Sequence, residues 1–134
     1  MSVAAGWTPL RIDLFPNRWT PFRFVIGFTS HDFTGSDFAM QVRPYPDAET
    51  SLMTLLTAPP GAQGISATNE TGVPGIMSQI VIEIYEPPLN GLPFPTPRGS
   101  DLVLSWDMVA TGPIIPKRRW FEGAFTVRAG TTHV

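Results

Sequence analysis

Two histidines are the side chains in this sequence best suited to acid–base or metal chemistry near neutral pH. His31 stands beside a turn at Asp32, and His133 is the penultimate residue. Neither belongs to a His-x-His or His-x-x-x-His pattern, and no acidic pair stands at the spacing of a metal site. We therefore expect both histidines to be ordinary surface or turn residues.

Glu122 is the third candidate, because it lies between apolar residues Trp120-Phe121 and Gly123. A partly buried carboxylate of this kind could act as a general acid. The alternative is a structural acceptor that bonds the backbone or an arginine, and the lack of a second carboxylate in the pattern favours it. No Gly-rich phosphate loop and no Gly-x-Ser-x-Gly motif is present. The sequence predicts a protein that is not an enzyme and holds no cofactor or metal.

Several other segments are candidates for contacts with other proteins. Lys117-Arg118-Arg119 is a compact basic run that could bind a phosphate or an acidic neighbour, or form a solvated turn. Trp7 and Trp19 lie near prolines, where each could cover the core or anchor an interface. Residues 93–97 could present an extended polyproline ligand or form a stiff crossover that another subunit buries. The candidate interface residues are Trp7, Trp19, Tyr45, Pro46, Leu92, Pro93, Phe94, Pro95 and Arg118.

Length and composition indicate one domain, residues 1–134, with many turns. The 134 residues are 43% hydrophobic but only 15% charged, with 15 prolines and 12 glycines. This balance favours an all-β protein whose surface is partly covered by partners. The net charge of −2 is spread along the chain, which argues against a nucleic-acid partner. No apolar run is long enough to span a membrane, and we see no secretory signal.

The elements expected to position these residues are short strands. The clearest pattern begins at a turn, where Asp32 accepts backbone hydrogen bonds and Gly35 takes a positive φ. In the strand that follows, Phe38, Met40 and Val42 share one face, which is the two-residue period of a half-buried strand. The same reasoning predicts strands at residues 10–14, 22–29, 37–43, 52–57, 65–68, 79–85, 102–109 and 121–128.

About eight short strands separated by turns predict a β-sandwich or a β-barrel, and an immunoglobulin-like antiparallel sandwich is favoured. The aromatic face of residues 22–28 should lie at the centre of the core. Residues 87–99 are too rich in proline for a regular helix and should form a crossover. Residues 1–17 should form an N-terminal arm with a short strand, and residues 130–134 a loose tail.

Two blocks of the sequence carry a resemblance to a known family. They are Asp32-Phe33-Thr34-Gly35 with Phe38-Ala39-Met40-Gln41-Val42-Arg43, and Trp120-Phe121-Glu122-Gly123-Ala124-Phe125-Thr126-Val127. In this order they resemble small β-sandwich modules of tailed-bacteriophage structural proteins, such as the N-terminal domain of siphophage baseplate upper proteins. Segments 22–26, 52–57 and 101–109 fit the same pattern, so the resemblance covers residues 18–129. The family has a short helical turn where this chain has its proline-rich segment 86–100.

The resemblance implies a structural protein of the virion, from the tail, baseplate or neck, assembled in the host cytoplasm. It implies self-association in rings or trimers and docking to other virion proteins, without catalytic residues. The alternative on the same sandwich is a module that binds a host-surface glycan or receptor. In that case Trp7, Trp19 or Tyr45 would stack on sugar rings.

Overall fold

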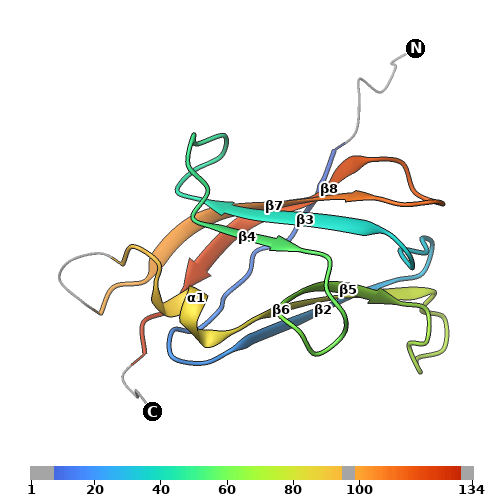
Figure 1. Ribbon diagram of the computed structural model, residues 1–134, viewed down its shortest axis with the longest axis horizontal. Coiled ribbons are helices and arrows are strands. Elements are labelled where there is room, and N and C mark those ends of the chain that lie inside the picture. Colours follow the sequence, from blue (N-terminus) through green and yellow to red (C-terminus); the bar gives the residue numbers. More distant parts are fainter. Residues whose placement is uncertain (1–7, 95–98, 131–134) are drawn as a thin grey trace.

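Residues 8–94 and 99–130, which the computed structural model describes, form eight strands and one short helix in two packed layers (Figure 1). In chain order they are β1 (Leu10–Arg11), β2 (Phe22–Phe28), β3 (Asp37–Arg43), β4 (Met53–Leu56), β5 (Gly64–Thr68), β6 (Ser78–Ile84), α1 (Glu86–Asn90), β7 (Leu102–Thr111) and β8 (Arg118–Val127). Trp7, Pro95, His133 and the expected tail beyond residue 130 lie outside the described residues. No helix in the described part is long and apolar enough to cross a membrane.

The strand order defines an immunoglobulin-like sandwich. One sheet has the order β1-β8-β7-β3-β4 and the other the order β2-β6-β5. The three-stranded sheet corresponds to strands B, E and D of an immunoglobulin domain, and β8, β7, β3 and β4 to strands G, F, C and C′. All pairs are antiparallel except β1 with β8. The predicted fold class is confirmed.

The turn and strand at residues 32–43 have the predicted structure. The backbone N–H of Thr34 donates to Oδ1 of Asp32 at 2.9 Å, and Gly35 has a φ of +77°. The hydroxyl and the backbone N–H of Thr34 beside the carboxylate hold the pKa of Asp32 below its usual value. The alternating residues Phe38, Met40 and Val42 of β3 are buried between the sheets. β3 pairs with β7 on one side and with β4 on the other.

The prediction that the aromatic face of β2 forms the centre of the core is wrong. Phe28 is buried, but Phe22, Phe24 and Ile26 are only half-buried. The reason is that β2 is the border strand of its sheet, so one side of these side chains is left uncovered. Fully buried residues of strands with a neighbour on both sides, including Phe121 of β8 and Ile82 of β6, make up the core instead.

The proline-rich segment does begin with a helix, contrary to the prediction. Helix α1 is a single turn, with Pro87 and Pro88 in its first turn. The N–H groups of a first turn have no partner within the helix, so prolines cost nothing there and their fixed φ suits the helix. Leu89 of this turn is fully buried against the core.

The N-terminal strand is shorter than predicted. Only Leu10–Arg11 forms a regular strand, but backbone hydrogen bonds continue along β8 as far as Arg18. Isolated bridges join Leu14 to Phe125 and Asn17 to Arg128. Residues 10–18 therefore follow β8 in parallel, and Leu14 and Pro16 are the buried residues of this segment.

Candidate interaction surface on the five-stranded sheet

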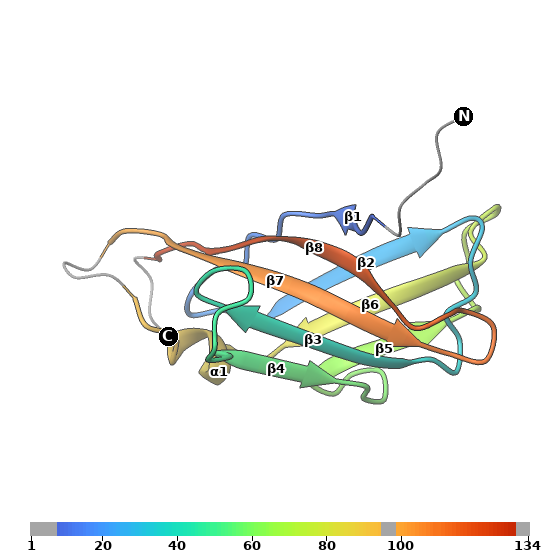
Figure 2. The same ribbon diagram turned by 90° about the horizontal axis from the view of Figure 1, so that it is seen from above.

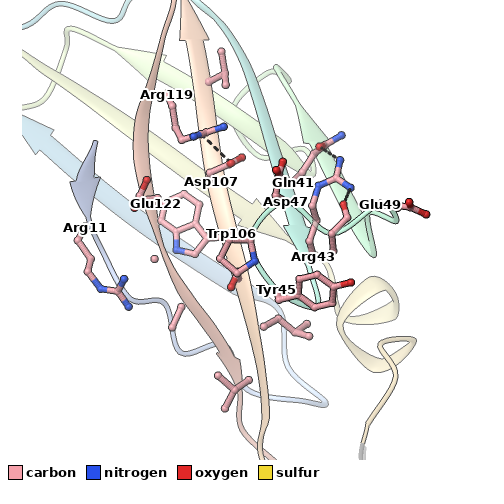
Figure 3. A pocket seen from close by; sticks show the side chains of 18 residues that line it. Arg11, Gln41, Arg43, Tyr45, Asp47, Glu49, Trp106, Asp107, Arg119 and Glu122 are labelled. Atoms are coloured by element: carbon pink, nitrogen blue, oxygen red, sulfur yellow. Dashed lines mark hydrogen bonds and ion pairs between the residues drawn. The ribbon is translucent and has the colours of Figure 1, made fainter. Parts of the chain in front are cut away.

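The outward face of the five-stranded sheet carries a wide, shallow hollow of about 940 Å³ (Figure 3). Its floor consists of outward-facing residues of β3, β7 and β8, and the loop between β3 and β4 forms one side. The side chains that give it its chemical character are Arg11, Gln41, Arg43, Tyr45, Asp47, Glu49, Val103, Asp107, Arg119 and Glu122. We call this surface the sheet-face hollow.

Strand register places four polar residues in one row across the floor of the hollow. Arg11 of β1 pairs with Glu122 of β8, Glu122 with Asp107 of β7, and Asp107 with Gln41 of β3. Directly paired residues of antiparallel strands have Cβ atoms about 4.5–5.5 Å apart, so Asp107 is the second carboxylate beside Glu122. The sequence pattern could not reveal it, because only the pairing of β7 with β8 brings the two acids together.

The charges in this row are only partly paired. Nε of Arg119 lies 3.0 Å from Oδ2 of Asp107, and Nη2 of Arg11 lies 3.1 Å from Oδ1 of Asp13. Both ion pairs are exposed, so each contributes only about 0–1 kcal/mol to stability. In both pairs, however, the charged groups of Asp107, Arg11 and Arg119 already have an oppositely charged partner within the chain.

Glu122 does not have the structural role that the sequence favours. Its carboxylate forms no hydrogen bond or ion pair with any residue of the described ranges, and Figure 3 shows it at the hollow. The general-acid alternative needs a carboxyl group that keeps its proton through burial in an apolar pocket. Glu122 and Asp107 instead lie on an open sheet face, each partly exposed. The hollow therefore presents Glu122 as an acceptor for an external donor.

A rigid loop holds Tyr45 at the side of the hollow. Arg43 donates to the carbonyl oxygen of Ala48 at 2.6 Å and to Oε1 of Gln41 at 2.6 Å. The N–H of Ala48 donates to the carbonyl oxygen of Tyr45 at 3.2 Å, which closes the turn. Tyr45 is 62% exposed, and Pro46 beside it is exposed as well. Both were candidate interface residues, and both lie where an external partner can reach them.

Val103 is a residue that the sequence reasoning did not single out as a site. It is 64% exposed on the outward face of β7, within the sheet-face hollow. Its position on the polar face of an alternating strand is the one feature of the sequence that could have singled it out. An apolar residue on that face has no packing role in the core.

Trp19 and Phe94, two further candidate residues, meet around one arginine rather than in the hollow. The guanidinium carbon of Arg18 lies 4.5 Å from the ring centre of Trp19 and 4.0 Å from that of Phe94. The backbone N–H of Trp19 donates to Oδ1 of Asn90 at 2.9 Å, which ties this cluster to α1. Trp19 is thus a packed residue, half-buried, and not a free stacking platform.

Leu92 and Arg118 also pack against other residues of the chain. Leu92 is 6% exposed and belongs to the core, whereas Pro93 next to it is exposed. Arg118 packs above the ring of Trp120 at 5.7 Å, and together with Arg119 it begins β8. The solvated turn predicted for this basic run describes Lys117, which is exposed in a bend, but not Arg118 and Arg119, because β8 begins at Arg118.

His31 lies in the β2–β3 loop, as its neighbouring turn suggested. Its ring meets Trp120 edge to face at a centroid distance of 5.2 Å, and its Nδ1 lies 3.0 Å from Oγ of Ser30. No group of three or more histidine, cysteine or acidic residues in the described ranges is arranged to hold a metal ion.

The class of protein that these observations define is an all-β, immunoglobulin-like sandwich with an open, polar sheet face. No family model matches the sequence, and no curated protein matches it. The chain is similar to one solved structure described as "Structure-based site-directed photo-crosslinking analyses of multimeric cell-adhesive interactions of VGSC beta subunits". That match has a TM-score of 0.38 and 12% identity over 100% of this chain and 99% of the other. A likeness of this size carries no inference about function.

Proposed function

We propose that this chain is a non-enzymatic structural protein of a bacteriophage virion, a component of the tail, baseplate or neck. It acts by associating with copies of itself and by docking to other virion proteins. The resemblance of residues 18–129 to phage β-sandwich modules supports a location of this protein in the virion. The observation that carries the docking role is the sheet-face hollow, an open polar surface with exposed Tyr45 and Val103.

The residue types of this surface suit contact with a protein. Interfaces are enriched in tyrosine and arginine and depleted in lysine. Lys117 is the single lysine among the nine basic residues of the chain, and arginines at positions 11, 43 and 119 line the hollow. Arginine is less strongly hydrated than lysine and presents a planar fork of donors, so it is the better residue for contacts from which water is removed.

The carboxylate of Glu122 adds a polar contact on the floor of this surface. A partner that approaches the hollow removes water from Glu122, and this costs free energy unless the partner supplies a donor. Val103 and Tyr45 supply apolar area that is exposed in the isolated chain. A partner with apolar side chains and at least one basic group therefore matches this surface best.

The substitution Val103→Arg tests this role, because it places a charge at the exposed apolar position of the hollow. We expect at least about tenfold less of the variant than of the natural chain in purified virions, the loss that about 1.4 kcal/mol of binding energy produces. Its thermal unfolding temperature should stay unchanged, since Val103 is not part of the core.

Val73→Arg is the matched control, since Val73 is also exposed but lies between β5 and β6, away from the hollow. It should enter virions like the natural chain. The proposal fails if the chain is monomeric at high concentration by light scattering and absent from purified virions. The role of the hollow fails if Val103→Arg is incorporated as well as Val73→Arg.

A further inference from the structure

Strand β2 presents an open hydrogen-bonding edge to solvent. It pairs with β6 along all seven of its residues, and no other strand of the described ranges pairs with its second side. Figure 2 shows β2 at one border of its sheet, with its arrowhead end clear of β7 and β8. Alternate residues of such a strand direct their N–H and C=O groups away from the sheet, where they can accept another strand.

The other border strands are shorter or partly covered. β1 has two residues and β4 has four, and Oγ of Ser51 donates to the carbonyl oxygen of Met53 in β4. On the side of β5 away from β6, the carbonyl oxygen of Ile65 accepts a hydrogen bond from the N–H of Ala58 at 2.9 Å. Proteins protect long edges with proline, bulges or charged side chains, and of these β2 has only the single charge of Arg23.

The side chains of β2 also show that this border is incompletely covered. Phe22 and Phe24 stack with ring centres 6.3 Å apart, and together with Ile26 they are only half-buried. Val25, on the outward side, is 38% exposed. A strand added beside β2 would cover the uncovered side of all four apolar residues.

A second copy of β2 fits this edge by symmetry. A two-fold axis at Val25, the midpoint of the strand, gives an antiparallel pair with the full overlap of seven residues. Val25 then faces Val25 of the second copy, and Phe24 faces Ile26. Arg23, the single charged residue of β2, faces Gly27, which has no side chain. No like charges oppose each other, and apolar residues meet apolar residues on the inner face.

We propose that two copies of this chain associate edge to edge through β2, joining their three-stranded sheets into one six-stranded sheet. This inference deepens the proposed function, on which it rests, by naming the surface of self-association. The sheet-face hollow lies on the other sheet and stays available for a different virion protein.

A single-cysteine experiment tests the proposed register, because the natural chain has no cysteine. In Val25→Cys the two thiols face each other with Cα atoms about 4.5–5.5 Å apart, within the range of a disulfide. In Arg23→Cys, on the same strand and face, the two thiols are four residues out of register, about 13 Å apart. Val103→Cys is an exposed control on the other sheet. Under mild oxidation Val25→Cys should form the disulfide dimer at least about tenfold faster than either control.

Charge reversal gives a second measurement that does not depend on a thiol. In the dimer, Gly27→Arg places an arginine of each copy opposite Arg23 of the other copy. The repulsion should weaken the natural association about tenfold or more in sedimentation equilibrium. A Cβ atom at Gly27 lies 3.4 Å from the nearest atom, in the flexible side chain of Ile76, and Gly27 itself is exposed, so we expect the fold to tolerate a side chain there. Combining Gly27→Arg with Arg23→Glu turns the repulsion into attraction and should restore association.

The outcomes separate this inference from the proposed function. If the natural chain associates but Val25→Cys cross-links no faster than Val103→Cys, another surface or another occupant covers β2, and the edge-to-edge dimer is wrong while the virion role stands. If the double variant associates no better than Gly27→Arg alone, the register is wrong. If the chain is monomeric at high concentration and absent from virions, the proposed function fails as well.

Discussion

At the scale of single residues, Gly123 explains how the N-terminal segment can lie against β8. A Cβ atom at this position would fall 2.7 Å from the carbonyl carbon of Ile12 and closer still to its oxygen. The same oxygen accepts a hydrogen bond from Nε1 of Trp106 at 2.8 Å, so Ile12 has little freedom to move. Packing therefore requires glycine at position 123, because any side chain there would collide with the backbone of Ile12.

Gly123→Ala should lower the free energy of unfolding by about 2–3 kcal/mol, because the methyl group forces Ile12 away from β8 in a well-packed region. Urea unfolding followed by tryptophan fluorescence measures this change. Gly27→Ala is the control, because its Cβ meets only the side chain of Ile76 at 3.4 Å. It should shift the stability by less than about 0.5 kcal/mol. Equal unfolding midpoints for the two variants would show that Ile12 yields without cost.

At the scale of elements, alternation predicted the strands that have one buried and one exposed face. Phe38, Met40 and Val42 of β3, which were expected to share one face, are buried, because this strand has a neighbour on both sides. The same signal overestimated the burial of the aromatic face of β2. Periodicity shows which side chains share a face, but it does not show whether the strand lies at the border of its sheet. It also missed α1, because proline breaks a helix in its interior but is tolerated in the first turn.

The short helix α1 holds the N-terminal turn through Asn90. Its Oδ1 accepts from the N–H of Trp19, a residue with the strained φ of 75°, and its Nδ2 donates to Oε1 of Glu86 at 3.3 Å. Asn90→Ala should cost about 1–2 kcal/mol, because the N–H of Trp19 loses its acceptor in a partly buried place. Asn69→Ala, in an exposed loop, is the matched control and should change little. Thermal unfolding of both variants tests whether the hydrogen bond from Trp19 to Asn90 stabilises the N-terminal turn. Equal unfolding temperatures of the two variants would show that it does not.

At the scale of the whole molecule, the interaction surfaces come from parts of the chain that are far apart in sequence. The floor of the sheet-face hollow combines outward-facing residues of β3, β7 and β8 with Arg11 of β1. Glu122 could be singled out from its apolar neighbours, but Asp107, Val103 and Gln41 became its neighbours only through strand pairing. A single sequence predicts which residues point outward, whereas register decides which of them meet.

The two sheets are joined at one end by Phe33, which lies in the loop that passes from β2 to β3. Its ring is fully buried and lies 4.7 Å from that of Phe28 in one sheet, and 6.4 Å and 6.5 Å from those of Phe38 and Phe121 in the other. Its N–H donates at 3.3 Å to Oγ of Ser78 in β6, which in turn donates to the carbonyl oxygen of His31 at 2.6 Å. Phe33 therefore contacts both layers at once.

Phe33→Ala should lower the free energy of unfolding by about 3–5 kcal/mol, because it leaves a cavity that neither sheet can fill alone. A domain of this size has a total of about 5–15 kcal/mol, so the variant should be near the limit of folding at 37 °C. Phe15→Ala is the control, since its side chain is 48% exposed, and it should cost less than about 1 kcal/mol. Calorimetry of both variants measures the difference. If Phe33→Ala unfolds within a few degrees of Phe15→Ala, the sheets are held together elsewhere along the sandwich, and the loop from β2 to β3 only covers its end.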